Sequence, residues 1–403
     1  MRNRPIICFI SHQSRMNGAE KSLLTLMQGI NESGRLQAVL LAPEKGPLVV
    51  HARSMGIKTY IVPYVFWTGK RGRWVVKRLV RLVVNLVTLP AVLLTLKRID
   101  PDLVYTNSLV VPSGALAARI LKIPHIWHAR EFVEEDFDGL YDWGASMSMS
   151  IIERFSKAVI CNSSAVRQKL YRLRKWRTPL SVTYNGFDVA HYNRVDATLK
   201  YKKSVTLSEF PVLLMVGSVM PQKGHEQAVL ALKMLIQRGL KVTLKIAGNS
   251  LAGYPEYLES ILSEYDGMGR HVLNFEGVVE DIDRLYQQAA ITLVCSKCEA
   301  FGRVAVESLL NGTPVIGTNN GGIPEVIQDD FTGLLYEPGN YTGLADKIEL
   351  LLNRPKVYER ILNAGQADIF NRFGKENYIK EISGHIGACL YNTRPSHHGR
   401  CRR

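Results

Sequence analysis

Cysteine is scarce in this sequence: six residues are scattered over a chain of 403. Cys295 and Cys298 form a lone C-x-x-C pair, with no second pair to complete a zinc site. A redox pair belongs at a helix N-terminus, whereas Cys295 ends the apolar run 291–295, which is typical of a buried strand. We therefore expect reduced cysteines and a cytoplasmic protein.

Uninterrupted apolar runs long enough to cross a membrane are also lacking. The nearest, residues 79–96, is interrupted by Arg81, Asn85 and Pro90. We therefore expect no membrane span, and leave contact with a membrane surface open. The first apolar run, residues 6–10, is short and is followed at once by His12, which argues against a signal peptide.

Acidic residues are absent from two long stretches of the N-terminal half, 45–99 and 154–187, in a chain whose formal net charge is +15. Both stretches contain many lysines and arginines, so this half should present a basic face. An excess of that size favours anionic partners, such as nucleic acid, an acidic membrane surface or phosphorylated substrates. No nucleic-acid-binding module is recognisable, so we expect no nucleic-acid partner.

Residues 73–81 mix cations with apolar side chains at helical spacing. Lys77 and Arg81 share one side of the expected helix, and most of the other residues are apolar. A basic amphipathic helix of this kind commonly lies on an anionic membrane, and Trp67 and Trp74 suit the interface. The alternative is an ordinary helix that packs its apolar side on a sheet; the second basic stretch favours the membrane.

Short β-branched runs alternate with longer amphipathic stretches along the whole chain. Expected strands include 6–11, 38–42, 103–106, 125–128 and 158–161 in the first half, and 212–216, 242–247, 272–275, 291–295 and 315–317 in the second. This alternation predicts an α/β protein with parallel sheets covered on both faces. We expect two Rossmann-like doubly wound domains, with ligand loops around a central cleft that the domains face.

The polar, weakly periodic stretch 189–209 separates the two alternating blocks. We therefore place an N-terminal domain at residues 1–195 and a C-terminal domain at residues 205–370. Residues 371–390 should form a final helix that packs back toward the N-terminal domain. Residues 391–403 read as a basic, disordered tail.

The segment from Glu299 to Glu307 carries the strongest functional signal. It follows an expected strand and opens a helix that ends at Asn311-Gly312, with Pro314 just beyond. A carboxylate at position 307 is unusual because its neighbours on that helix face are apolar. Burying it requires hydrogen-bond partners. Ribose hydroxyls would serve, and so would backbone groups or a nearby arginine.

Gly302 and the backbone amides of Arg303 and Val304 fall at the N-terminus of that helix. Free N–H groups and the positive end of the helix dipole favour a phosphate there. A second loop, residues 217–224, ends near Lys223, whose charge would stabilise a diphosphate leaving group; a solvated loop lysine is the plainer interpretation.

The loop 317–325 contains the pair Gly321-Gly322. Glycines there allow a ligand to approach the backbone closely, and glycines needed only for the turn would look the same. The run from Cys295 to Pro338, which contains this loop and the spacing Glu299-x7-Glu307, resembles glycosyltransferase family 4. Further matches are Asn17-Gly18-Ala19-Glu20, His128-Ala-Arg130-Glu131 and Asn185-Gly186-Phe187-Asp188. The resemblance extends over nearly the whole chain and is weakest between residues 64 and 97.

The resemblance implies a GT-B fold, in which residues 1–195 form an acceptor-binding domain and residues 205–370 a nucleotide-sugar-binding domain. It also implies a role for each matching residue of the C-terminal half. Glu299 would hold the hydroxyls of the donor sugar, and Glu307 would bind ribose. Lys223 would hold the diphosphate together with the main-chain amides near Arg303 and Val304.

Two matching residues of the N-terminal half also receive roles from the resemblance. Gly18 would lie in a loop that approaches donor or acceptor, and His128 would lie near the transferred sugar. One departure concerns donor binding: the family usually has arginine directly after the glycine that corresponds to Gly217, and this chain has Ser218. The leaving group should then be less stabilised unless another residue, such as Arg303, compensates.

Retention in this family is attributed to front-face attack, in which the leaving diphosphate takes the acceptor proton. Asp281-Ile-Asp283 and Asp136-Phe-Asp138 spell the D-x-D pattern of metal-dependent transferases. The first pair, however, opens an expected helix, where the dipole favours acids, and the second lies in an acidic loop. We expect neither a metal site nor a cofactor.

These observations predict a retaining glycosyltransferase that moves a sugar from a nucleotide diphosphate sugar to a glycan or lipid-linked acceptor, at the cytoplasmic surface of an anionic membrane. The resemblance suggests surface polysaccharide or glycolipid biosynthesis. A GT-B nucleotide-sugar epimerase is the enzymatic alternative. A catalytically weak, membrane-associated scaffold subunit is the other, and Ser218 is the one feature that favours it.

Overall fold

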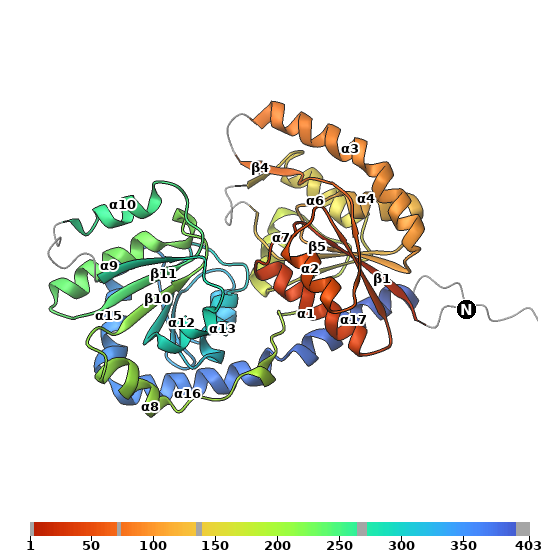
Figure 1. The fold of residues 1–403 in the computed structure, drawn as a ribbon. Coiled ribbons are helices and arrows are strands. Elements are labelled where there is room, and N and C mark those ends of the chain that lie inside the picture. The colour runs from red at the N-terminus through yellow and green to blue at the C-terminus, as the bar shows by residue number, and fades with distance from the viewer. Residues whose placement is uncertain (1–3, 71–73, 134–138, 264–271, 392–403) are drawn as a thin grey trace, which may run out of the picture. The chain divides into compact units, whose positions relative to one another are not determined.

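The structure, a computed structural model, describes residues 4–70, 74–133, 139–263 and 272–391. It divides into two compact units: Met1–Phe187 with Lys375–Arg403, and Asp188–Gly374 (Figure 1). Each unit contains a parallel sheet with flanking helices, so the predicted α/β architecture is confirmed. The predicted tail from residue 392 onward lies outside the described residues, as do Asp136 and Asp138.

The first unit is built on a parallel sheet of seven strands in the order β3-β2-β1-β5-β6-β8-β9. The strands are β1 (Ile6–Ser11), β2 (Gln37–Ala42), β3 (Lys58–Ile61), β5 (Leu103–Asn107), β6 (His125–Ala129), β8 (Ala158–Cys161) and β9 (Leu180–Val182). Because the central strands are buried on both faces, they read as continuous apolar runs in the sequence.

Helices cover both faces of this sheet. The helices are α1 (Gly18–Glu32), α2 (Pro47–Ser54), α3 (Trp74–Ile99), α4 (Ser113–Leu121), α6 (Ala145–Arg154), α7 (Ser164–Leu173) and α17 (Lys375–Tyr391). One core joins α1, α2 and α17 to the face of the sheet that carries Phe9 and Tyr105. On the other face Gly114 of α4 lies against Ile10 and Thr106, where a Cβ would clash.

Helix α3 is an outlying element that packs on α4 and on β4 (Thr68–Lys70), which pairs antiparallel with β7 (Gly139–Tyr141). Among the described residues it is the one helix long and apolar enough to cross a membrane. Lys77 and Arg81, expected to share one side of the helix, have different surroundings. Lys77 is exposed, whereas Arg81 forms an ion pair with Asp142, which is only 3% exposed, so Arg81 faces the unit and adds no exposed charge.

The second unit is built on a parallel sheet of six strands in the order β12-β11-β10-β13-β14-β15. The strands are β10 (Val212–Val216), β11 (Thr243–Ala247), β12 (Leu273–Gly277), β13 (Ile291–Val294), β14 (Val315–Thr318) and β15 (Leu334–Tyr336). The helices are α8 (Ala197–Tyr201), α9 (His225–Gln237), α10 (Tyr254–Ser260), α12 (Ile282–Gln288), α13 (Arg303–Leu310), α14 (Ile323–Val326), α15 (Tyr341–Asn353) and α16 (Pro355–Arg372). This topology brings β10, β13 and β14 side by side.

The segment that follows the first sheet belongs to the second unit from Asp188 onward, seven residues before the expected end of the first domain at 195. Tertiary contacts explain the difference. The amide of Val195 donates to Oε1 of Gln366 at 3.1 Å, and α8 packs against α16. These contacts fasten a polar stretch whose own periodicity is weak.

The last helix, α17, lies in the first unit, where it packs against α1. The amide of Lys375 donates to the carbonyl of Phe187 at 2.8 Å. The backbone of Gly186 lies so close to Tyr378 that an added Cβ would sit 2.5 Å from the tyrosine Cβ. The expected helix 371–390 is therefore shorter at its start, since Asn371 and Arg372 end α16.

Candidate functional site

The carboxyl ends of β10, β13 and β14 carry most of the residues predicted to bind a donor. Gly217, Ser218 and Lys223 lie in the loop from β10 to α9, and Glu299 and Gly302 lie in the loop from β13 to α13. Ligands of open α/β sheets bind at the carboxyl ends of the strands. Because these strands are neighbours in the sheet, their loops form one edge of the second unit.

Lys223 and Glu299 meet at this edge. The ammonium nitrogen of Lys223 lies 2.7 Å from Oε2 of Glu299. The hydroxyl of Ser296 donates to the same carboxylate oxygen at 3.0 Å. The two charged side chains are 32% and 24% exposed, so each keeps access to solvent. The structure thus brings together two predicted site residues that lie 76 positions apart in the sequence.

The N-terminus of α13 opens toward the same edge. Gly302 precedes the helix with a φ of +97° and provides no side-chain cap for the first amides. A Cβ at this position would lie 2.5 Å from Cδ1 of Ile323, so only glycine suits both the conformation and the space. The amides of Arg303 and Val304 then lie in the first turn, where anions are favoured.

The carboxylate of Glu307 has partners within the chain. Its Oε1 accepts hydrogen bonds from Nε and Nη2 of Arg303 at 3.2 and 3.0 Å, and its Oε2 accepts one from the hydroxyl of Tyr286 at 3.4 Å. Burial and the adjacent carboxylate raise the pKa of Tyr286 well above its ordinary value. A nearby arginine, one of the partners considered from sequence, is therefore present, and a ribose would compete with it.

The glycines of the two loops serve different purposes. Gly217 has a φ of +138° and open space where a Cβ would point, so the backbone at the end of β10 is accessible. Gly321, with a φ of +63°, would place a Cβ 2.4 Å from the carbonyl oxygen of Glu299, and the amide of Gly322 donates to that oxygen at 2.7 Å. This second pair packs against the backbone that carries Glu299.

Of the two D-x-D pairs, Asp281 and Asp283 lie among the described residues, and both make local contacts. Asp281 accepts a hydrogen bond from the amide of Arg284 and caps α12. Asp283 accepts one from the side chain of Asn311 at 2.7 Å. Within the described ranges no group of three or more His, Cys, Asp or Glu side chains gathers in an arrangement that could hold a metal ion.

The two remaining predicted residues, Gly18 and His128, belong to the first unit. Gly18 is the first residue of α1. His128 is fully buried on β6, and its Nδ1 is hydrogen-bonded to the hydroxyl of Tyr105. Burial and the nearby Arg130 keep the pKa of His128 well below its ordinary value. Its Nε2 has no partner among the described residues.

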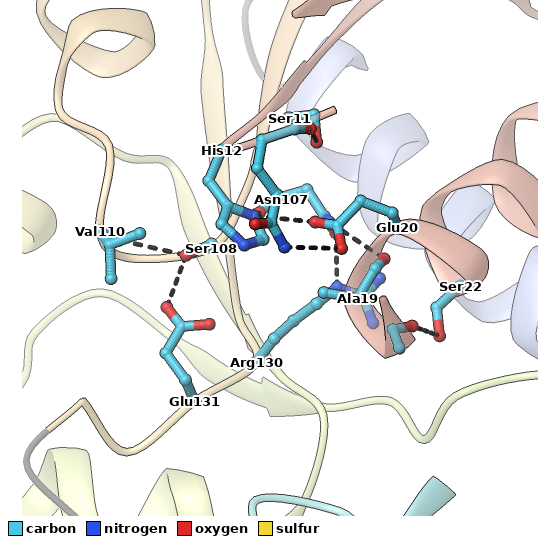
Figure 2. Close-up of polar contacts among 12 residues, drawn as sticks. Ser11, His12, Ala19, Glu20, Ser22, Asn107, Ser108, Val110, Arg130 and Glu131 are labelled. Atoms are coloured by element: carbon cyan, nitrogen blue, oxygen red, sulfur yellow. Dashed lines mark hydrogen bonds and ion pairs between the residues drawn. The ribbon is translucent and has the colours of Figure 1, made fainter. Parts of the chain in front are cut away.

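A polar cluster that the sequence reasoning did not assign lies at the carboxyl ends of β1, β5 and β6 (Figure 2). Nδ1 of His12 lies 3.2 Å from Oε1 of Glu20 and 3.2 Å from the carbonyl oxygen of Asn107. A carbonyl oxygen can only accept, so Nδ1 of His12 is the donor in its contact with Asn107. Glu20 is fully buried and also accepts from Gln13 at 3.0 Å. The position of Glu20 in the Asn17–Glu20 match was the only signal for this pair.

Arg130 is the centre of a second part of this cluster. Its guanidinium donates to the side-chain oxygens of Asn107 and Asn185 and, at 2.8 Å, to the hydroxyl of Tyr378. Arg130 is only 6% exposed. It therefore links two of the sequence matches, His128–Glu131 and Asn185–Asp188, to helix α17. The neighbouring Glu131 accepts from the hydroxyl of Ser108 at 2.7 Å (Figure 2), and its burial raises its pKa.

The sequence patterns of two known families match consecutive parts of the chain. "Glycosyltransferase Family 4" matches residues 16–191, and "Glycosyl transferases group 1" matches residues 198–368. The first match lies almost wholly in the first unit and the second lies in the second unit. Together they leave only the ends of the chain and a short connection unmatched.

Individual relatives are similar over more limited stretches. An uncharacterized glycosyltransferase of Methanocaldococcus jannaschii is 26% identical over 280 residues, which is 66% of this chain and 70% of the relative. N-acetyl-alpha-D-glucosaminyl L-malate synthase of Bacillus anthracis is 27% identical over 59% of this chain and 62% of its own length. The capsular polysaccharide biosynthesis glycosyltransferase CapM of Staphylococcus aureus is 24% identical, and the match spans about half of each protein, 52% and 53%.

Solved structures share the fold over nearly the whole chain. HepE of Anabaena, in complex with UDP and glucose, has a TM-score of 0.79 at 22% identity, covering 96% of this chain and all of HepE. Sucrose-phosphate synthase of Thermosynechococcus elongatus has a TM-score of 0.74 at 18% identity, covering 97% of this chain and all of that protein. These structures show that the chain has the GT-B fold, and the two family matches show that it belongs to glycosyltransferase family 4.

Proposed function

We propose that the chain is a retaining, metal-independent glycosyltransferase that takes a sugar from a nucleotide diphosphate sugar. The observation that carries this proposal is the meeting of Lys223 and Glu299 beside the N-terminus of α13. A cation and helix amides suit a diphosphate, and a carboxylate suits the hydroxyls of a sugar. Glu307, in the same helix, would bind ribose in exchange for Arg303.

The chemistry follows from these groups. The acceptor oxygen forms a bond to the anomeric carbon on the face from which the diphosphate leaves, and the bonding electron pair departs with the diphosphate. A diphosphate oxygen takes the proton of the acceptor hydroxyl, so no protein base is needed. Lys223, the α13 amides and a released Arg303 would together stabilise the developing negative charge, in place of a divalent metal.

The relatives support the class of donor and acceptor. HepE was solved with UDP and with glucose, and TarM was solved with UDP and glycan ligands. CapM acts in capsular polysaccharide biosynthesis by its name. We propose by analogy a nucleotide diphosphate hexose as donor, and a glycan or lipid-linked acceptor in surface polysaccharide or glycolipid biosynthesis.

We further propose that the chain works at the cytoplasmic face of an anionic membrane. The net charge of +15 and the acid-free stretches of the first unit support an anionic surface as partner. The five cysteines among the described residues are free, which suits a reducing compartment.

Binding of UDP, GDP and ADP by calorimetry, without divalent metal, tests the donor site. We expect one nucleotide to bind, with affinity reduced about tenfold or more in Glu307→Ala, because the ribose loses a charged hydrogen-bond acceptor. Glu256→Ala, an exposed change at the start of α10, is the matched control. Binding by none of the three, or only with Mn²⁺ present, would contradict the metal-free donor site.

Product analysis with the nucleotide sugar chosen by that experiment separates the alternatives. Transfer to an acceptor with the anomeric configuration of the donor kept, followed by NMR, supports the proposal. A sugar that changes configuration at a ring carbon without an acceptor would identify an epimerase. Nucleotide binding with no turnover on glycan and lipid acceptors would identify a scaffold subunit.

A further inference from the structure

The outer side of α3 presents a continuous apolar surface. Seven large side chains are each more than half exposed and follow one another at spacings of one or three residues, with one longer interval of seven: Val76, Leu79, Val80, Val83, Leu86, Val87 and Leu94. Pro90 and Ala91, also exposed, fill the longest interval. This outer stripe extends for about 27 Å along the helix at 1.5 Å per residue. Exposed apolar surface of this extent marks an interaction site.

Two polar residues in the first half of α3, Arg81 and Asn85, lie on the opposite side and are bonded to other elements of the first unit. Arg81 pairs with Asp142. Asn85 accepts hydrogen bonds from the amide of Val65 and the hydroxyl of Ser113, both at 3.2 Å. Further along the same side, Val92 and Leu96 are fully buried. The middle of the helix is therefore reversed relative to an ordinary surface helix, with Arg81 and Asn85 inward and a row of apolar side chains outward.

This attachment decides between lying on a bilayer and crossing it. A helix in the hydrocarbon core is surrounded by lipid on every side. For α3 to cross, it would have to detach from α4 and carry Arg81 and Asn85 into lipid without Asp142, Ser113 and Val65, which is strongly unfavourable. Only its outer side is available to lipid.

The charges around the stripe select the occupant. Exposed cations lie near both ends of the stripe, Lys77 directly beside its first residue and Lys97 and Arg98 beyond its last, and residues 45–99 contain no acid. Anionic headgroups complement this arrangement. In a symmetric pair of copies, antiparallel α3 helices would bring the cations of one copy to the cations of the other, which opposes self-association through this face.

We propose that α3 lies in the plane of an anionic membrane, with its outer stripe in the acyl layer and its terminal cations at lipid phosphates, and that it does not cross. The proposal deepens the proposed function, on whose membrane partner it rests, by naming the element that inserts and the layer that it enters. It would keep the first unit at the surface where a lipid-linked acceptor is found.

Co-sedimentation of the full chain with vesicles tests the proposal without donor or acceptor. We expect binding to phosphatidylcholine vesicles that contain phosphatidylglycerol, and retention of most of it at high salt, because apolar insertion is not screened. The triple variant Leu79→Glu, Val83→Glu, Val87→Glu should lose about tenfold or more of its vesicle affinity. The matched control Val50→Glu, Leu207→Glu, Val278→Glu changes equally exposed apolar residues elsewhere and should bind as the unaltered chain does.

Several outcomes would overturn the inference. Equal binding by the stripe variant, or complete release of the unaltered chain by salt, would reduce the membrane contact to surface charge. A dimer in solution that the stripe variant abolishes would identify a second copy as the occupant. Thermal unfolding of each variant checks that it is folded, and nucleotide binding in the absence of vesicles reports the proposed donor site separately, so the two can fail independently.

Discussion

Nζ of Lys223 lies 2.7 Å from Oε2 of Glu299, so two groups expected to bind different parts of a donor are bonded to each other. The pair joins the loop after β10 to the loop after β13. Binding a diphosphate would draw Lys223 toward phosphate oxygens and leave the carboxylate for sugar hydroxyls. Donor binding would therefore replace one ion pair by two sets of new contacts, and neither charged group would be left without a partner.

Replacing Lys223 by methionine should reduce donor turnover far more than stability. Loss of one group that stabilises a developing charge costs about 10²-fold or more in kcat. A partly exposed ion pair contributes about 0–1 kcal/mol to the free energy of unfolding. Nucleotide release from the donor and the thermal unfolding midpoint measure the two effects.

The matched control for this change is Lys245→Met. Lys245 pairs with Glu276 at 3.3 Å, and their exposures of 27% and 30% resemble those of the first pair, but they lie on β11 and β12, away from the loops of β10 and β13. We expect unchanged turnover. A similar loss in both variants would mean that Lys223 acts through folding and not on the leaving group.

Restoring arginine at position 218 should strengthen donor binding. Ser218 is exposed at the end of β10, where the family resemblance places a cation. A charge-assisted hydrogen bond to phosphate contributes about 1.5–3 kcal/mol, so Ser218→Arg should tighten nucleotide binding about tenfold or more. Ser218→Gln, which adds length without charge, is the control. No gain from arginine would indicate that Arg303 already supplies this contact.

Removing the guanidinium of Arg130 should loosen the attachment of α17. Arg130→Met leaves the side-chain oxygens of Asn107 and Asn185 and the hydroxyl of Tyr378 without their donor. Unsatisfied buried groups cost about 1–3 kcal/mol each, so we expect a loss of about 3 kcal/mol. All five tryptophans lie in the first unit, so their fluorescence during urea unfolding measures this loss.

Hydrogen exchange provides the second readout for Arg130. Amides of α17 should exchange faster in the methionine variant, while those of α13 in the second unit should not change. Arg360→Ala, which removes an exposed ion pair with Asp330, should alter stability by less than about 0.5 kcal/mol. Unchanged protection of α17 would show that apolar packing on α1 alone holds the helix.

The sequence was sufficient to predict the parallel sheets and the position of α13. Alternating apolar runs identify the strands, and Gly302 and Asn311-Gly312 mark the ends of the helix, because these signals are local. Lys223 and Glu299 received separate roles from the sequence, and their contact was not predicted because it depends on β10 and β13 being neighbours in the sheet. Ser296, which also binds Glu299, had no signal of its own.

Long-range and orientational features could not be read from sequence. Helical spacing shows which residues of α3 share a side, but it does not show which side faces inward, and the buried Asp142 reversed the expectation for Arg81. Likewise, the close approach of His12 and Glu20 depends on how α1 docks beside β1. The three-residue strands β4 and β7 pair residues that lie 69 to 73 positions apart, and neither strand is long enough to show a period.

The first unit should lose stability in mild acid because it buries a neutral histidine. His125 is 2% exposed, and burial lowers its pKa to about 3, against an ordinary value of 6.5. Below about pH 6.5 the unfolded chain takes up a proton that the folded unit does not. Stability is therefore complete above pH 6.5 and falls toward pH 3, at up to about 1.4 kcal/mol per pH unit. The lowered pKa of His128 acts in the same direction.

His125→Gln separates this contribution from the rest of the acid response. Glutamine does not titrate, and its amide can replace Nε2 of His125 as the partner of the Thr106 hydroxyl, which lies at 2.8 Å. Urea unfolding followed by tryptophan fluorescence, between about pH 7 and pH 5, should show a slope smaller by about one proton than in the unaltered chain. Equal slopes would mean that His125 takes up its proton in the folded unit, and that acid acts on the first unit through His128 or through groups at its surface.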